Sequence, residues 1–157
     1  MEGGYGGPGF GDEDVKKVSV PVVSVRKDKE APPVIIKVRS EEDLGVFKKT
    51  HELTLKIYRV SKDFPTEERF GLTFQMRRAA ASIGANLMEG GHRLNRKEFR
   101  QFVGIAKGSA GELKYHLLLA KDLGYLPAGE YEELRAGLEE ISKMLNGLIG
   151  SLSDTKH

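Results

Sequence analysis

Arginine and lysine side chains are concentrated between residues 69 and 107, and guanidinium and ammonium groups are the donors that proteins use to bind phosphate. This stretch contains eight basic residues and only two acidic ones, Glu89 and Glu98, which gives it a formal charge of +6. Four of the cations, Arg93, Arg96, Lys97 and Arg100, lie within eight residues of one another. We predict a nucleic-acid interface that reads shape and backbone, made by Arg77, Arg78, Arg93, Arg96, Lys97, Arg100 and Lys107.

The total charge conceals this concentration. The 157 residues include 25 Lys and Arg against 23 Asp and Glu, a net charge of +2. Outside the basic stretch, residues 40–157 contain 10 basic and 15 acidic residues, a charge of −5. The distribution therefore predicts one face that attracts a polyanion and another that repels it.

Four polar residues follow one line of a predicted helix. Gln75, Ser82, Asn86 and Glu89 are separated by 7, 4 and 3 residues. If this line is buried, its members must bond to one another, to backbone or to a second subunit; Ser109, Glu112 and Arg93 are the candidate partners. For Asn86, Glu89 and Arg93 we favour a role in a subunit interface over contact with RNA. A homo-oligomeric protein–protein scaffold or accessory subunit without nucleic-acid contact is thus the alternative function.

Catalysis and metal binding are not predicted. Without cysteine there is no thiol nucleophile and no thiolate ligand. Glu89 and His92 have the Glu-x-x-His spacing of di-iron bundles, but a second copy is missing, because Glu112 and His116 are four apart. His51 and His116 sit singly on apolar stripes. We therefore expect no enzyme, no catalytic residue, no metal site and no cofactor.

The elements that must position these residues are helical from residue 40 onward. Helices are predicted over 40–62, 72–89, 95–123 and about 131–152. The first begins at an N-cap Ser40, the second ends at Gly90-Gly91, and the third opens with a capping-box-like pair, Asn95 and Glu98. The first has its apolar stripe at Leu44, Phe47, His51, Leu55 and Tyr58; the last has steps of 3 and 4 from Tyr131 to Leu152. Short connections between four such helices predict an all-α, antiparallel, up-and-down four-helix bundle.

The first 39 residues differ in composition. Six of the first eleven are glycine, and two β-like runs follow, at 18–23 and 34–38. We predict two parts: a flexible Gly-rich and Val-rich or β-like extension, residues 1–39, and a bundle domain, residues 40–157. No apolar run is long enough to span a membrane, and the N-terminus does not have the pattern of a secretory signal, so we expect a cytoplasmic protein.

An ordered series of motifs over about residues 40–152 resembles the bacterial four helix bundle protein family, also called the 23S ribosomal RNA intervening-sequence protein family. The motifs are Phe64-Pro65, Glu68, Gly71-Leu72, Gln75, Arg77-Arg78-Ala79-Ala80, Ser82-Ile83, Asn86, Glu89-Gly90, Arg93, Phe99, Ile105-Ala106, Gly108-Ser109-Ala110, Glu112-Leu113 and Leu123-Gly124-Tyr125-Leu126. Gly84 stands where many members have proline, and residues 1–39 lie outside the family pattern.

The resemblance implies a bundle that assembles with itself into a ring, typically a homopentamer. It also implies a link to ribosomal RNA genes. The family is similar in structure to the accessory protein of diversity-generating retroelements, a basic pentamer that binds nucleic acid and a reverse transcriptase. The partners implied are therefore a second copy of the chain, ribosomal RNA or another nucleic acid, and a reverse-transcriptase-like protein.

Overall fold

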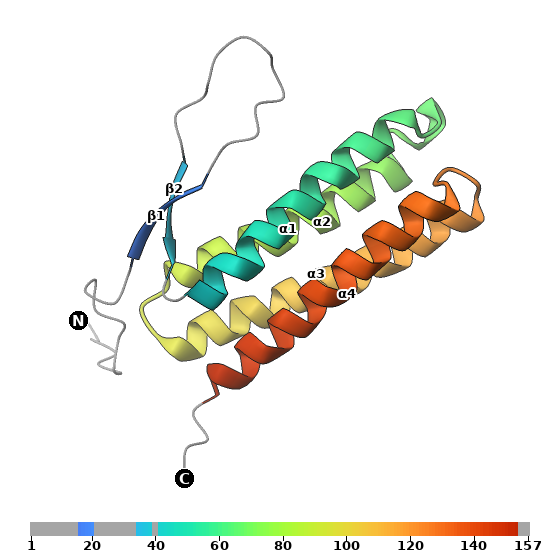
Figure 1. Ribbon diagram of the computed structural model, residues 1–157. Helices are drawn as coiled ribbons and strands as arrows, with labels where there is room; N and C mark the ends of the chain where they lie inside the picture. Colours follow the sequence, from blue (N-terminus) through green and yellow to red (C-terminus); the bar gives the residue numbers. More distant parts are fainter. Residues whose placement is uncertain (1–15, 21–33, 39–40, 154–157) are drawn as a thin grey trace, which may run out of the picture.

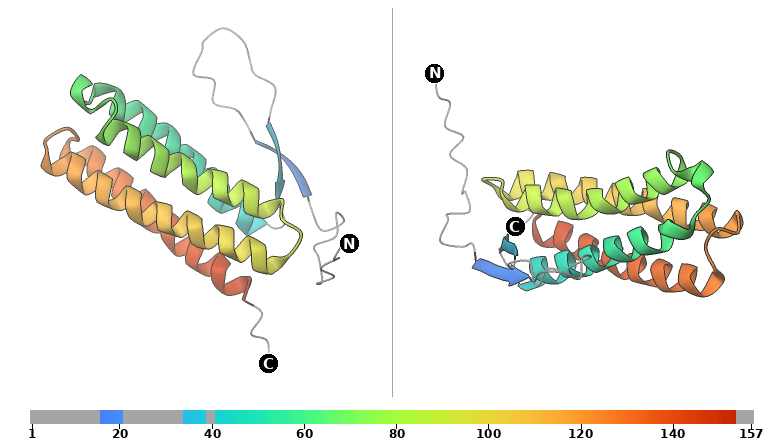
Figure 2. Two further views of the ribbon diagram at one scale, coloured as in Figure 1. Left: turned by 180° about the vertical axis from the view of Figure 1, so that it is seen from behind. Right: turned by 90° about the horizontal axis from the view of Figure 1, so that it is seen from above.

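The computed structural model describes residues 16–20, 34–38 and 41–153. Its four long helices are α1 (Glu41–Val60), α2 (Leu72–Gly91), α3 (Arg96–Asp122) and α4 (Ala128–Ser151), with short 3-10 turns η2 (Ser61–Asp63) and η3 (Thr66–Glu68) between α1 and α2. Each helix runs antiparallel to the one before it, and α4 packs back against α1, as Figures 1 and 2 show. The predicted up-and-down four-helix bundle is confirmed.

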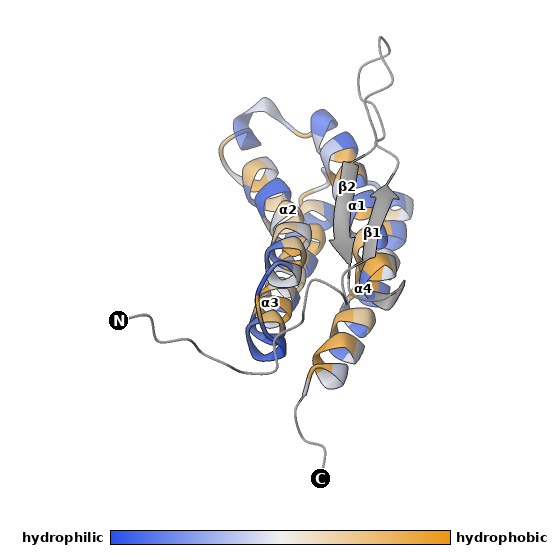
Figure 3. Ribbon diagram, turned by 90° about the vertical axis from the view of Figure 1, so that its left-hand side faces the viewer, coloured by the Kyte–Doolittle hydropathy of each residue, from blue (hydrophilic) through white to orange (hydrophobic). Residues whose placement is uncertain are grey.

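The buried core is apolar and is shared by all four helices. In α4 the predicted 3/4 pattern holds: Leu134, Leu138, Ile141, Leu145 and Leu148 are buried, and Leu152 follows just beyond the helix. Figure 3 shows hydrophobic and hydrophilic residues interleaved along each helix. A helix with one apolar stripe gains stability by turning that stripe toward its neighbours and leaving its polar residues in water.

The predicted apolar stripe of the first helix was wrong. The residues of α1 that enter the core are Val46, Thr50, Leu53 and Ile57, whereas Tyr58 is exposed and Phe47, His51 and Leu55 are only half-buried. Both sets have helical 3/4 spacing, so the sequence contains two overlapping stripes. The larger aromatic side chains occupy the flank toward α2, where Gly84 leaves space beside Thr50 and Phe47.

The predicted end of α2 is wrong, whereas the predicted cap at the start of α3 is confirmed. Helix α2 continues through Gly90 and Gly91 instead of ending before them. Gly90 is buried against α3, so tertiary packing overrides the weak helical propensity of glycine. At the start of α3, Asn95 Oδ1 accepts a hydrogen bond of 2.8 Å from the backbone N–H of Glu98, as the predicted cap requires.

Ahead of the bundle, β1 (Lys16–Val20) and β2 (Val34–Val38) pair as an antiparallel hairpin, with Val18 opposite Ile36. Strand β2 also contacts α1 and α2, which places the hairpin beside the start of α1 (Figure 1). The second β-like run has the predicted bounds. The glycine-rich head, the predicted end of the first strand at residues 21–23 and the N-cap Ser40 all lie outside the described residues.

Candidate nucleic-acid and assembly surfaces

Three of the polar residues predicted to act together form a seam between α2 and α3. Ser82 Oγ and Ser109 Oγ, one from each helix, are 2.9 Å apart. Asn86 Nδ2 donates to the carbonyl oxygen of Ser82 at 2.8 Å and to its Oγ at 3.0 Å. We call Ser82, Asn86 and Ser109 the α2–α3 polar seam. All three are half-buried, so their hydrogen bonds replace part of the hydration they lose.

The remaining polar residues do not join this seam. Glu89 pairs with Arg93 one helical turn away, at 2.8 Å, and the Arg93 guanidinium lies 4.7 Å from the centre of the Phe102 ring. Glu112 Oε1 is 3.9 Å from His116 Nε2. For Gln75, the structure gives no side-chain hydrogen bond to another described residue. The predicted polar line is therefore one seam with separate pairs beside it.

Two of the predicted phosphate-binding arginines cap the last helix. Arg96 Nη2 donates to the carbonyl oxygen of Ser151 at 2.8 Å, and Arg100 Nε donates to that of Ile149 at 3.4 Å. The last carbonyls of a helix have no partner within it and carry partial negative charge, so these cations stabilise the end of α4. The sequence did not reveal this contact, because it depends on the α2–α3 turn lying beside the end of α4 (Figure 1).

Exposed cations continue along one side of α3. Arg100, Lys107, Lys114 and Lys121 are each seven residues apart, and we call these four the α3 basic row. Seven residues are two turns, so successive members lie about 10 Å apart along the helix. Lys107 and Lys114 form no ion pair with any described residue, whereas the Lys121 ammonium lies 4.8 Å from the ring centre of Tyr131. Lys114 and Lys121 fall outside the predicted set, although their seven-residue spacing could have identified them.

Arg77 and Arg78 lie apart from the other predicted nucleic-acid residues. They occupy the first turns of α2, at the opposite end of that helix from the α2–α3 turn (Figure 2). Arg77 Nε donates to Ser61 Oγ at 2.8 Å and its Nη2 to the carbonyl oxygen of Tyr58 at 3.2 Å, which ties α2 to the end of α1. The seven predicted residues therefore do not make one continuous surface. Lys97, Arg100 and Lys107 are the ones that extend together from the turn along α3.

Large apolar side chains remain exposed on the side formed by α2, α3 and the loop before α2. Phe70 is 85% exposed, and Phe74 and Ile105 are about half exposed. Ala81 and Ala85 lie on the outer face of α2 and leave it flat between Phe74 and Met88. Apolar side chains gathered on one side of a helix pair are typical of a surface that another protein covers.

The two histidines predicted on apolar stripes, His51 and His116, lie against other side chains of the bundle. His51 stacks on Phe47, with ring centres 6.2 Å apart and planes 5° from parallel. His116 is mostly buried, and its Nδ1 has no hydrogen-bond partner among the described residues. His92, in the Glu-x-x-His pattern, places its Nδ1 2.8 Å from the carbonyl oxygen of Met88. Within residues 16–20, 34–38 and 41–153, the structure contains no group of three His, Asp or Glu side chains placed to hold a metal ion.

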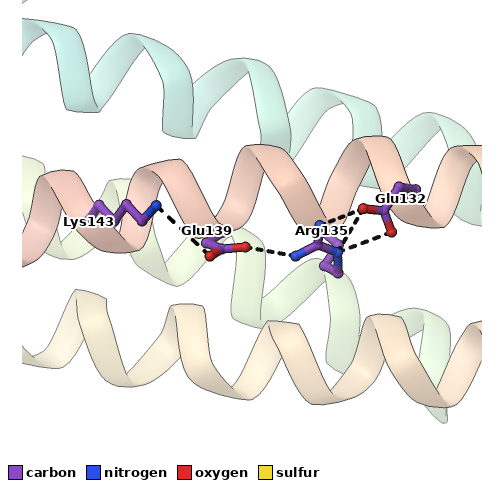
Figure 4. A network of polar contacts seen from close by, with 4 residues as sticks. All are labelled: Glu132, Arg135, Glu139 and Lys143. Carbon is purple, nitrogen blue, oxygen red and sulfur yellow. Dashed lines mark hydrogen bonds and ion pairs between the residues drawn. The ribbon is translucent and has the colours of Figure 1, made fainter.

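Two exposed carboxylates of α4, Glu132 and Glu139, form ion pairs within their own helix. Arg135 donates to both Glu132 and Glu139, and Lys143 Nζ lies 4.0 Å from Glu139 (Figure 4). The hydrogen bond from Arg135 lowers the pKa of Glu132 below its ordinary value, and the charges of Arg135 and Lys121 act in the same direction. These carboxylates are therefore largely neutralised by cations of their own helix.

None of the described helices is both long and apolar enough to cross a membrane.

The fold and the α2–α3 polar seam place this protein in the class of small antiparallel four-helix bundles that have a polar contact between the second and third helices. The family model described as 23S rRNA-intervening sequence protein matches residues 42–147. The chain belongs to this family.

One solved structure is similar over nearly its whole length. It is a protein with unknown function from the S23 ribosomal protein family of Bacteroides thetaiotaomicron, 30% identical in sequence, with a TM-score of 0.65. The match covers 69% of this chain and 98% of that one. No curated protein matches at a significant level. The part of the chain that is shared is therefore the bundle itself.

Proposed function

We propose that this protein is a non-catalytic, self-associating bundle that binds structured RNA or another nucleic acid through the α2–α3 turn and the α3 basic row. The observation that supports this most is the alignment of Arg100, Lys107 and Lys114 along one exposed side of α3, with Lys97 at its start. Cations in such a row contact phosphates along a nucleic-acid backbone and carry no base information, so affinity arises from the backbone. The cytoplasm is the compartment where we expect this to occur.

Structured RNA is the first ligand to test because the family description concerns sequences that intervene in 23S ribosomal RNA. The deep, narrow major groove of an RNA helix hides its bases from side chains, so proteins recognise such helices mainly by shape and phosphate contacts. A rigid helix with cations about 10 Å apart is suited to this form of recognition.

Self-association, which we also propose, would serve the same function. The exposed apolar side chains of α2 and α3, with Phe74 and Ile105 among them, would be covered in an assembly of several copies. In a ring, with the homopentamer as the expected form, each copy would present its own basic row. Several weak phosphate contacts would then act together and raise the overall affinity.

The test is binding of a structured RNA and of duplex DNA across a salt series, with the wild type and the variant K97Q/K107Q/K114Q. The slope of log K against log salt should fall by about 0.9 per lysine on duplex DNA. The control variant K48Q/R59Q/K143Q removes the same charge from exposed positions of α1 and α4 and should leave most of the affinity intact. Equal binding by the wild type and K97Q/K107Q/K114Q would contradict the proposal.

The protein–protein scaffold is the second candidate, favoured by the exposed apolar side chains. Light scattering separates the two functions. An oligomer without salt-dependent nucleic-acid binding would favour the scaffold, or an accessory subunit of a larger protein such as a reverse transcriptase. A monomer at micromolar concentration would remove the multivalent argument from the nucleic-acid proposal.

A further inference from the structure

A cleft of about 280 Å³ lies where α1 turns into α2. This turn is at the opposite end of α2 from the α2–α3 turn (Figure 2). Three cationic side chains line it, those of Lys62, Arg69 and Arg77, and none of the described residues on its walls is a carboxylate. Phe64 and Pro65 add an apolar part to the wall. The cleft therefore combines several positive charges with a partly dry surface, on which an anion is less screened than in open water.

One cation of this cleft is held in place by the fold. Arg77 Nε donates to Ser61 Oγ and its Nη2 to the carbonyl oxygen of Tyr58, while the guanidinium lies 4.8 Å from the Tyr58 ring centre. Arg77 Nη1 has no acceptor among the described residues. Ordering this side chain during folding reduces the entropy that a ligand must remove.

Hydroxyl groups complete the donor set. Thr66 and Thr73 line the same cleft, Thr66 exposed and Thr73 buried at the base of α2. Thr73 lies in the first turn of the 20-residue helix α2, the end of a helix that carries partial positive charge, where the carboxylate of Glu68 already accepts from the N–H of Leu72.

The nearby carboxylate of Glu68 turns away from the cleft. Its Oε2 accepts from the backbone N–H of Leu72 at 2.8 Å, and Tyr125 Oη donates to its Oε1 at 3.5 Å. The other acids of this loop, Asp63 and Glu67, are exposed and are not among the residues that line the cleft. The charged side chains that line the cleft itself are therefore the three cations.

We propose that this α1–α2 cleft is a second anion site, which binds a phosphate monoester between Lys62, Arg69 and Arg77. A monoester carries close to two negative charges at neutral pH and several acceptor oxygens, which matches three cations and two threonine hydroxyls. A singly charged carboxylate would leave most of these donors unused. The site lies near the start of α2, and its occupation does not depend on the α3 basic row.

The experiment uses the full chain and inorganic phosphate as the probe, titrated by calorimetry at constant ionic strength with chloride as the balancing ion. The variant K62Q/R69Q should bind phosphate at least roughly tenfold more weakly, because each lost charge-assisted hydrogen bond weakens binding by about this factor. The matched control K48Q/K143Q removes two exposed cations of α1 and α4, outside both proposed binding surfaces, and should bind phosphate like the wild type. Both replaced pairs are exposed, so the melting temperature should not change.

A second comparison separates two sources of the phosphate group. An RNA oligonucleotide with a 5′-phosphate is titrated against the same oligonucleotide with a 5′-hydroxyl. Preference for the phosphorylated end, lost in K62Q/R69Q, assigns the cleft to a nucleic-acid terminus; phosphate binding without that preference assigns it to a free phosphorylated ligand.

Absence of phosphate binding, or equal binding by the wild type and K62Q/R69Q, overturns the proposal. If K62Q/R69Q fails to fold, T73V decides, because valine keeps the volume of Thr73 and removes its hydroxyl: unchanged phosphate binding by T73V overturns the proposal, and weaker binding supports it. The salt-series experiment on K97Q/K107Q/K114Q tests the α3 basic row independently, so the two proposals fail separately.

Discussion

The α2–α3 pair and the α1–α4 pair lie on opposite sides of the bundle and are held together differently. Helices α2 and α3 approach so closely that a side chain at Gly90 would meet Phe99 and Phe102. Helices α1 and α4 are bridged by Lys49–Glu140 and Lys56–Glu133, at 2.7 and 2.9 Å, beside a cleft of about 170 Å³. The first contact depends on shape and the second partly on long, solvated side chains. Substitutions should therefore be tolerated very differently on the two sides.

The largest effect should come from Gly90→Ala. A Cβ at this position would lie 2.7 Å from Phe102 Cβ and 2.8 Å from Phe99 Cδ2, which is too close for real atoms. We expect a loss of about 1–3 kcal/mol in the free energy of unfolding, measured by urea denaturation. Gly104→Ala is the control: its Cβ would meet nothing within 4 Å, so it should stabilise the helix by up to about 1 kcal/mol. Equal effects at the two glycines would refute the close-packing argument.

An intermediate effect is expected in the α2–α3 polar seam. Ser82→Ala removes the hydroxyl that contacts both Ser109 and Asn86, and should lower the free energy of unfolding by about 1 kcal/mol. In a double-mutant cycle with Ser109→Ala, the two losses should not add, because both remove the same hydrogen bond. Simple additivity would show that the seam contributes nothing to holding the two helices together.

A small effect is expected on the α1–α4 side. Lys56→Ala breaks an ion pair whose side chains are 44% and 63% exposed. We expect a loss of no more than about 0.5 kcal/mol in thermal or urea unfolding, and less at high salt. A loss as large as that of Gly90→Ala would contradict the proposed contrast between the two helix pairs.

The smallest effect concerns the outer face of α4 and is visible through pH. The folded pKa of Glu132 lies below its unfolded value, chiefly because of the hydrogen bond from Arg135. The contribution of this pair is therefore present above the unfolded pKa and is lost as the pH falls through the folded one. In an NMR titration, Arg135→Gln should raise the pKa of Glu132 more than Lys121→Gln does, since Lys121 is the weaker of the two influences. The reverse order would contradict this assignment.

The sequence predicted the parts of the fold that depend on local pattern. The apolar residues of α4 follow one unbroken 3/4 spacing, and that spacing predicted which of them are buried. The side chain of Asn95 caps α3, as its residue type suggests. The same reasoning was wrong for α1, where a buried threonine, Thr50, takes a core position between Val46 and Leu53. Period alone cannot choose between two overlapping stripes when the truly buried one contains a polar residue and the flanking one is aromatic.

The sequence predicted fewer of the contacts that form the candidate surfaces. The Ser82–Asn86 contact follows from spacing on one helix, but the partner Ser109 depends on how α2 and α3 align. The sequence predicts Arg96 and Arg100 only as phosphate ligands, because nothing local shows that the end of α4 lies beside them. The α1–α2 cleft collects residues from two 3-10 turns and a helix, so no single motif indicates it.

The hydrogen bonds from Arg96 and Arg100 to the end of α4 also affect how the α2–α3 turn would respond to a ligand. A free arginine samples many rotamers, and a ligand that immobilises one loses on the order of 0.5–1.5 kcal/mol of binding energy to the lost rotamer entropy. In this fold the closing of the bundle has already restricted both side chains. A phosphate that reaches them meets a preorganised turn, so its binding should lose less side-chain entropy than binding to a turn with freely rotating arginines.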